Sequence, residues 1–290
     1  MIGALACAPS AVGAQGLDSS IVPDGALRAT LEIALDSAGL PESLAGLGEL
    51  RELIAPRRGI RSLEGLEYAS GLEVLDLTGN EIGDASPVGR LGALRSLRLG
   101  HNRLSEVGWL SGLERLEALV LDFNELREVG AVRALGSLRW FNAAGNELTD
   151  LSALRGLQDL RGVWVGSNDL TDLTWASELA QLQTLVVHNN RIGSLAPIHR
   201  LESLVQVNLS ANPLGALGDL TGWRSLRQLT LRDVGLTSSA AFTGLESLEW
   251  LDARDNALTE VEGLAGLTSL TRLFLSRTPG RWHASDHRRS

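Results

Sequence analysis

Apolar and polar positions in this chain follow a pattern that repeats every 22 residues. In each repeat, two apolar residues with the spacing of a β-strand precede an asparagine, and further apolar residues follow it at intervals of three. The interval of three suits 3₁₀ turns better than a long α-helix. The register predicts eleven turns, and the clearest of them align without gaps as LEVLDLTGNEI, LRSLRLGHNRL, LEALVLDFNEL, LRWFNAAGNEL, LRGVWVGSNDL, LQTLVVHNNRI, LVQVNLSANPL and LEWLDARDNAL.

The recurring asparagine is predicted to be structural. A buried amide at the point where the chain leaves a strand can bond backbone groups of its own and adjacent turns, and buried polar groups need such partners. A ligand-binding role is the alternative that we do not favour. Val234 interrupts the series, and Trp223 replaces a core leucine just before it. The predicted ladder comprises Asn80, Asn102, Asn124, Asn146, Asn168, Asn190, Asn212 and Asn256.

The pattern LxxLxLxxNxL resembles the 22-residue class of the leucine-rich repeat family. That class is known from bacterial internalin-like proteins and from a eukaryotic regulatory subunit of protein phosphatase 1. The resemblance covers about residues 44–278 and implies an α/β solenoid, an arc or horseshoe. Its parallel β-sheet would line the concave face, with 3₁₀ or irregular segments on the convex face. One turn cannot bury its own leucines, so we expect stability to come from stacking of neighbouring turns.

The two ends of the repeat region differ. Residues 17–43 are predicted to form a helical cap resembling that of internalin-like proteins, with a helix start at Pro23-Asp24 and a stop at Gly39. Its apolar stripe consists of Leu27, Leu31 and Leu35. Residues 279–290 are polar and basic and are predicted to be a disordered tail. The last turn, around Leu273 and Phe274, is therefore expected to present an uncapped edge.

The first 16 residues, MIGALACAPSAVGAQG, are small and apolar, and VGA before Gln15 would suit a signal peptidase. They predict a truncated signal peptide and export from a bacterium to the periplasm, cell surface or medium. The alternative is a disordered terminus on a cytoplasmic protein. The single cysteine, Cys7, excludes an intrachain disulfide framework, and no apolar run is long enough to cross a bilayer.

Charge and motif content argue against nucleic-acid binding and catalysis. The net charge is −9, without the basic footprint that binding to phosphates requires. No glycine-rich phosphate loop or metal-ligand spacing is present, so no cofactor and no metal is predicted. His188 and Ser210 are expected to be lateral neighbours, but no carboxylate flanks them to orient the imidazole. The sequence therefore predicts a protein that is not an enzyme.

The outward-facing strand positions supply the candidate binding site. Trp140 is predicted to lie diagonally from Trp164, and Gly162 to leave room for the Trp140 ring. Gly162 and Gly166 are expected to clear space in which the indoles receive a ligand. The alternative is that the indoles only pack on each other and cover the sheet; Trp109 and Trp175 are predicted to be packing residues. The candidate partner-binding residues are Trp140, Trp164, Phe123, Val120, Val186, His188, Arg232, Arg254, Asp122 and Trp250.

An aromatic centre with a charged rim is typical of protein-binding surfaces. The sequence therefore predicts a recognition module that binds a protein through its concave face, with Arg232 and Arg254 contributing charge selection. A glycan is an alternative ligand. The alternative functions are self-assembly through the C-terminal edge and an intracellular phosphatase-regulator-like scaffold. The chain is expected to be a monomer or a homo-oligomer formed through that edge.

Overall fold

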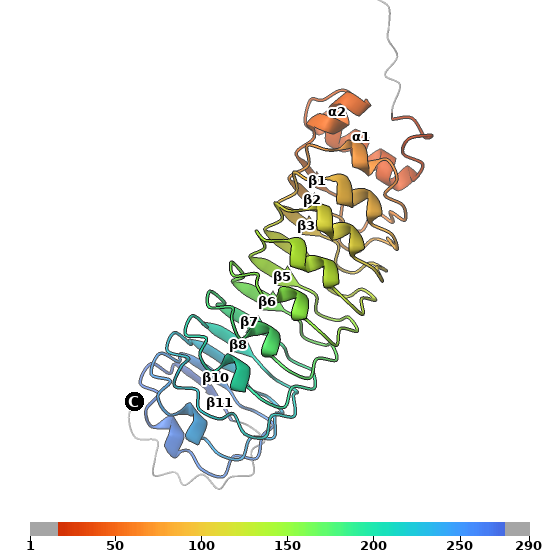
Figure 1. The fold of residues 1–290 in the computed structure, drawn as a ribbon. Helices are drawn as coiled ribbons and strands as arrows, with labels where there is room; N and C mark the ends of the chain where they lie inside the picture. Colours follow the sequence, from red (N-terminus) through yellow and green to blue (C-terminus); the bar gives the residue numbers. More distant parts are fainter. Residues whose placement is uncertain (1–16, 276–290) are drawn as a thin grey trace, which may run out of the picture.

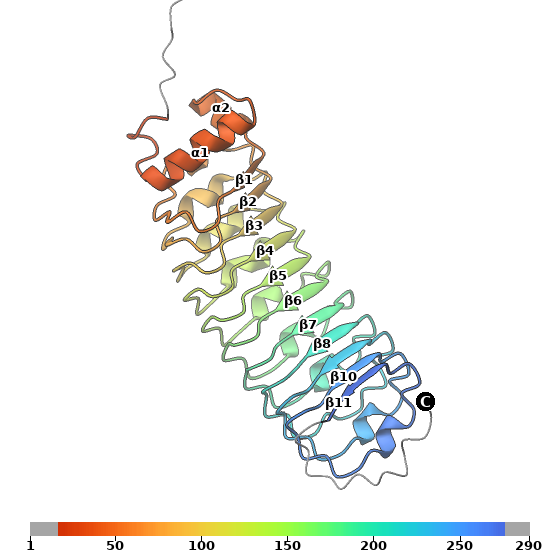
Figure 2. The same cartoon turned by 180° about the vertical axis from the view of Figure 1, so that it is seen from behind.

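The computed structural model describes residues 17–275, which form an elongated solenoid (Figure 1). All eleven strands belong to one parallel sheet and follow each other in sequence order along one side of the solenoid (Figure 2). The strands are β1 (Glu52–Ile54), β2 (Val74–Asp76), β3 (Ser96–Arg98), β4 (Ala118–Val120), β5 (Trp140–Asn142), β6 (Gly162–Trp164), β7 (Thr184–Val186), β8 (Gln206–Asn208), β9 (Gln228–Thr230), β10 (Trp250–Asp252) and β11 (Arg272–Phe274).

The register of the sheet follows the 22-residue repeat. Phe141 pairs with Val163, which pairs with Leu185, so the middle residue of each strand stacks on its equivalent one turn away. These three side chains are fully buried. The eleven-stranded parallel sheet confirms the predicted solenoid. It forms because apolar residues alternate in each strand, so that only one face of the sheet packs inward.

Short 3₁₀ segments form the side of the solenoid opposite the sheet, as the apolar interval of three predicts. The connection from β8 to β9 contains no 3₁₀ segment and precedes Val234, where the asparagine series is interrupted. The segments are η1 (Leu66–Tyr68), η2 (Ser86–Arg90), η3 (Gly108–Gly112), η4 (Gly130–Ala134), η5 (Ser152–Leu154), η6 (Thr174–Ala176), η7 (Ala196–Ile198), η8 (Ala240–Phe242) and η9 (Glu262–Leu264).

The core is one continuous apolar column along the solenoid. Trp223 is fully buried in it, in place of the usual leucine, and its indole Nε1 donates a hydrogen bond to the Ile198 carbonyl at 2.9 Å. Trp175 in η6 is also buried, at 3% exposure. Both side chains therefore belong to the packing of the core.

The eight asparagines form a hydrogen-bonded ladder inside the solenoid. Asn168 is representative: its Nδ2 donates to the Ala143 and Val165 carbonyls, and its Oδ1 accepts from the Leu148 N–H at 2.9 Å. Each amide thus joins its own turn to the preceding one. Val234 cannot make these bonds, and there the Leu214 N–H donates instead to the carbonyl of Asn212 at 2.8 Å.

Two helices cover the N-terminal end of the sheet (Figure 2). In α1 (Gly25–Ser37), the expected stripe of Leu27, Leu31 and Leu35 is fully buried. The Asp24 carboxylate accepts from the first N–H groups of α1 and also from the N–H groups of Arg61 and Ser62, so it ties the helix to the first turn.

The second helix, α2 (Leu44–Glu49), lies where the sequence predicts the first repeat rather than a helix. The Ser43 hydroxyl accepts from the Gly46 N–H at its start. A Cβ at Gly46 would lie 1.9 Å from the Pro41 carbonyl oxygen, so this close approach requires glycine. At the other end, Leu273 and Phe274 of β11 are 39% and 38% exposed. The predicted signal peptide, residues 1–16, and the predicted tail, residues 279–290, lie outside the described residues.

Candidate functional site

The outer face of the sheet, which we call the sheet face, carries the side chains that do not enter the core. The register places Trp164 of β6 directly between Asn142 of β5 and Val186 of β7 on this face. Gly162, the first residue of β6, is the lateral neighbour of Trp140. Trp140 and Trp164 therefore occupy diagonal positions on adjacent strands, which large aromatic side chains can bridge.

The two indoles pack against each other over Gly162. Their ring centroids lie 6.0 Å apart with an interplanar angle of 33°, within the range of favourable aromatic pairs. A Cβ at Gly162 would lie 2.5 Å from Cη2 of Trp164 and 2.6 Å from Cε3 of Trp140. Trp140 is 40% exposed and Trp164 is half-buried, so the pair presents a preassembled aromatic surface to solvent.

The expectation that Gly162 and Gly166 clear open space on the face is wrong. The indoles of Trp140 and Trp164 fill the space above Gly162, and the His188 imidazole fills the space above Gly166. A Cβ at Gly166 would lie 2.3 Å from Cε1 of His188. These glycines hold large neighbouring side chains flat against the sheet.

A second aromatic contact lies beside β4. Phe123 has a φ of 51°, so it belongs to the left-handed turn after the strand rather than to the strand itself. Its ring lies over Gly145 and stacks on His101 with centroids 4.4 Å apart and an interplanar angle of 17°. The Asp122 carboxylate lies over Gly100, 3.7 Å from Nε2 of His101. Phe123 is 53% exposed and extends the aromatic surface toward the N-terminal end.

His101 is missing from the residues predicted for the site. It occupies the same place in its turn as Phe123, directly before a ladder asparagine and 22 residues earlier. Positive φ values recur at this place, at Arg57, Gly79, His101, Phe123, Gly145, Ser167, Asn189, Ala211, Asp233 and Asp255. The repeat itself could have indicated the stack, because residues at this place become lateral neighbours.

His188 is half-buried and burial lowers its pKa. Its Nδ1 is buried and has no hydrogen-bond partner among residues 17–275. The Ser210 hydroxyl accepts from the Arg232 N–H at 3.1 Å instead of pairing with the imidazole. The geometry thus assigns His188 to the surface around Trp164 rather than to a nucleophile–base pair.

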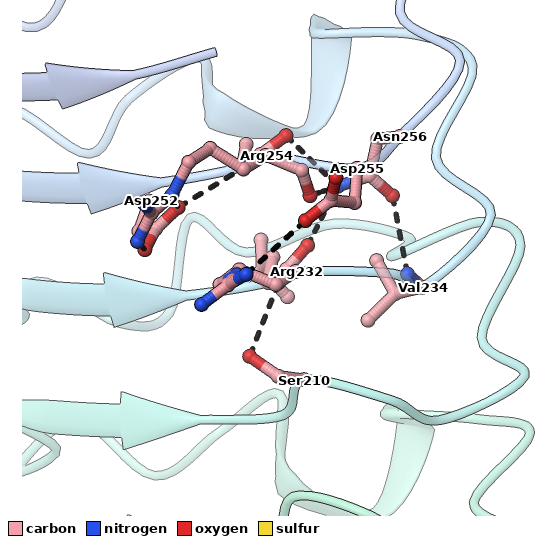
Figure 3. A network of polar contacts seen from close by, with 9 residues as sticks. Ser210, Arg232, Val234, Asp252, Arg254, Asp255 and Asn256 are labelled. Atoms are coloured by element: carbon pink, nitrogen blue, oxygen red, sulfur yellow. Dashed lines mark hydrogen bonds and ion pairs between the residues drawn. The ribbon is translucent and has the colours of Figure 1, made fainter. Parts of the chain in front are cut away.

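Arg232 and Arg254 lie in a network of ion pairs toward the C-terminal end (Figure 3). The guanidinium of Arg254 donates two hydrogen bonds, of 2.8 and 2.5 Å, to the Asp252 carboxylate, which is 3% exposed. Arg232 Nη2 lies 3.2 Å from Oδ2 of Asp255. Burial alone would raise the pKa of Asp252, but the hydrogen bonds from Arg254 and the nearby positive charges lower it. Both arginines are therefore compensated by carboxylates within the chain.

Trp250 belongs to a separate cluster at this end. Its ring centroid lies 5.9 Å from that of Phe274, and the guanidinium of Arg272 lies over it at 5.5 Å. Four strand spacings of about 4.8 Å separate β10 from β6, roughly 19 Å in all. The predicted site residues thus form two groups, one around Trp140, Trp164 and Phe123 and one around Trp250.

Residues 17–275 contain no cluster of His, Cys, Asp or Glu suited to a metal ion. Within the same residues, no helix combines the length and apolar character needed to span a membrane.

The sequence profile of the family described as "Leucine rich repeat" matches residues 70–126 and 92–148. These matches and the eleven-stranded parallel sheet agree on the same repeat. The chain has the leucine-rich-repeat fold. A comparison with curated protein sequences finds no match.

Solved structures with similar leucine-rich-repeat folds include two internalins from Listeria monocytogenes. Internalin InlF is 22% identical with a TM-score of 0.62, covering 91% of this chain and 92% of its own. Internalin C2 is 23% identical with a TM-score of 0.54, covering 89% and 96%. The Arabidopsis receptor kinase HAESA, solved in complex with a peptide hormone and a co-receptor, is 22% identical with a TM-score of 0.58, covering 66% of this chain and 35% of its own. Leucine-rich-repeat proteins of this kind are protein-interaction modules and are generally not enzymes.

Proposed function

We propose that this protein binds a protein partner through the sheet face around β4 to β8, with Trp140 and Trp164 as anchors. The observation that carries the proposal is the packed pair of indoles on the solvent side of the sheet. Exposed aromatic residues near the centre of a surface are the side chains that most often dominate binding energy. Phe123, stacked on His101, and the half-buried Val120, Val186 and His188 extend this surface.

The packing of the pair favours binding energetically. A free side chain loses rotamer entropy when a partner immobilises it, at about 0.5–1.5 kcal/mol for each rotamer-rich side chain. Here each indole already contacts the other and lies against Gly162, so most of that ordering occurs on folding. The surface is therefore preorganised for a partner.

Affinity capture with the full chain tests the proposal, with the Trp140→Ala/Trp164→Ala double variant beside the wild type. A specific protein partner should be retained by the wild type and lost by the double variant. Trp109→Ala is the matched control, because Trp109 lies in η3, on the side opposite the sheet, and its Nε1 donates to Glu106 at 3.2 Å. Capture of the same partner by all three forms would refute the site.

Self-association through β11 is the second candidate function, favoured by the exposure of Leu273 and Phe274. Light scattering over micromolar concentrations should show a concentration-dependent rise in mass that Phe274→Asp removes. A constant monomer mass would refute it.

The proposed location is outside the cytoplasm, on the basis of the small apolar residues 1–16. Fusing residues 1–20 to an alkaline phosphatase that is active only after export tests this in a bacterial host. Activity equal to that of a leaderless fusion would refute an export signal within residues 1–20.

A further inference from the structure

The centre of the sheet face lacks acidic residues. Four consecutive turns cross it with residues 139–145, 161–167, 183–189 and 205–211, which contain no Asp or Glu. Two residues of each segment, such as Phe141 and Val163, point into the core instead of onto the face. Eight of these 28 positions are buried in the core, and the chain average, 35 acidic residues in 290, would place about two in the other 20. We call these segments the acid-free region; it contains Trp140, Trp164 and His188, and its two arginines are Arg139 and Arg161.

Arg161 stands at the end of a row of ion pairs. The residue before each strand alternates in charge along the first turns, so that Glu117 lies 2.7 Å from Nη1 of Arg95 and 3.3 Å from Nη1 of Arg139. Arg161 is next in this row, and no carboxylate among residues 17–275 lies within ion-pair distance of its guanidinium. Arg227, at the equivalent place before β9, pairs with Glu249. The guanidinium of Arg161 therefore has no counter-carboxylate within ion-pair distance among residues 17–275, and Arg161 directly precedes Gly162, the glycine beneath both indoles.

The net charge of −9 does not cancel this local excess of positive charge. Ionic screening limits interactions between exposed charges to about 8 Å at physiological salt. Strands lie about 4.8 Å apart, so carboxylates beyond the neighbouring turns contribute little at the centre of the region. Glu117, on the turn before the acid-free region and two turns before Arg161, already shares its charge between Arg95 and Arg139.

We propose that the partner segment bound at the aromatic pair is acidic: an extended stretch of protein with Asp or Glu beside an apolar side chain. The apolar side chain packs on Trp140 and Trp164, and its carboxylates pair with Arg161 and Arg139. Four strands span roughly 15–20 Å, which about six extended residues cross. A basic segment would find no counter-charge in the acid-free region, and a neutral glycan would leave Arg161 unpaired. This inference rests on the proposed function, of which it specifies the partner.

Selection from a random library of linear 12-residue peptides, displayed on phage, tests the inference against the immobilised full chain. The selected peptides should be enriched in Asp and Glu next to Leu, Phe or Trp. Their affinity should fall about tenfold in Arg161→Ala, the loss of one well-placed charge contact at an interface. Raising NaCl from about 50 to about 500 mM should weaken binding to the wild type more than to Arg161→Ala.

Arg227→Ala is the matched control, because it removes the same charge from the same row outside the acid-free region. It should change affinity less than about twofold. Selected peptides that are basic or uncharged, or acidic peptides that bind Arg161→Ala as tightly as the wild type, would overturn the inference. So would a failure to select any peptide while sulfated or uronic glycans bind through the indoles. Peptides that need Trp164 but not Arg161 overturn only the inference; peptides indifferent to both indoles also overturn the proposed function.

Discussion

Replacing a single ladder asparagine tests how the turns are held together. In Asn168→Ala, the Leu148 N–H loses the Oδ1 that is its acceptor, at 2.9 Å, in a buried position. The three carbonyls that accept from Asn168 Nδ2 keep other donors: Ala143 retains Asn146 Nδ2, Val165 retains Asn190 Nδ2 and Gly166 retains the Gly145 N–H. The substitution therefore leaves one buried donor without a partner and removes one of the donors to each of three carbonyls.

The expected magnitude follows from this inventory. A buried polar group left without a partner costs about 1–3 kcal/mol, and each other lost hydrogen bond about 0.5–1.5 kcal/mol. We therefore expect Asn168→Ala to lower the free energy of unfolding by about 2–4 kcal/mol. Asn142→Ala is the control, since its amide lies on the sheet face and accepts one local hydrogen bond, from the Ala144 N–H at 3.0 Å. It should cost under about 1 kcal/mol.

Urea titration followed by circular dichroism measures both variants. Because repeat proteins can unfold in parts, the denaturant slope of each variant must match that of the wild type for the free energies to be compared. Hydrogen exchange at Leu148 should also accelerate in Asn168→Ala. If Asn168→Ala lowers the free energy of unfolding by no more than Asn142→Ala does, the structural role of the ladder is refuted.

Three further predictions concern single positions. Val234→Asn should change stability by less than about 1 kcal/mol, because the Leu214 N–H already donates to Asn212; a gain as large as the loss in Asn168→Ala would contradict this. Gly162→Ala should push the indoles outward, shift tryptophan emission to longer wavelength and lower the free energy of unfolding by about 1–3 kcal/mol. The control Gly136→Ala, whose Cβ would meet open space, should have none of these effects. Equal emission spectra of the two variants would show that the indoles do not lie on Gly162. Burial lowers the pKa of His188, so the unfolded chain binds the proton more readily, and the free energy of unfolding should fall as the pH drops below about 6.5. The variant His188→Gln should show a smaller fall. Identical pH profiles of stability for the variant and the wild type would refute the role of His188 in this pH dependence.

Strict spacing made the fold predictable from the sequence. Every turn repeats the same apolar positions at 22-residue intervals, and a shift of one residue would turn the core side chains outward. The α2 helix was not predicted, because its leucines follow the same spacing as those of the repeat. Leu44, Leu47 and Leu50 also step by three, so their spacing matches a 3₁₀ turn as well as a short helix, and the contact that decides between them is the close approach of Gly46 to Pro41.

The candidate site was predictable in position but not in conformation. The register placed Trp140 and Trp164 on adjacent strands, yet whether the space above Gly162 stays open depends on side-chain rotamers. The compensation of Arg254 by Asp252 had a signal in the sequence, since residues two apart in a strand share a face. The lone charge of Arg161 depends on distances to carboxylates on other turns, and only the structure supplies these.

The aromatic pair of Trp140 and Trp164 on the sheet face is the proposed binding site for the partner. Isothermal titration of the captured partner against the wild type, Trp109→Ala and Trp140→Ala/Trp164→Ala tests it directly, once circular dichroism shows that all three are folded. Because the two indoles are proposed as central anchors, we expect the dissociation constant of the double variant to be about 100-fold or more higher than that of the wild type. The constant of Trp109→Ala should be unchanged. Constants for the double variant within about twofold of the wild type would contradict the claim.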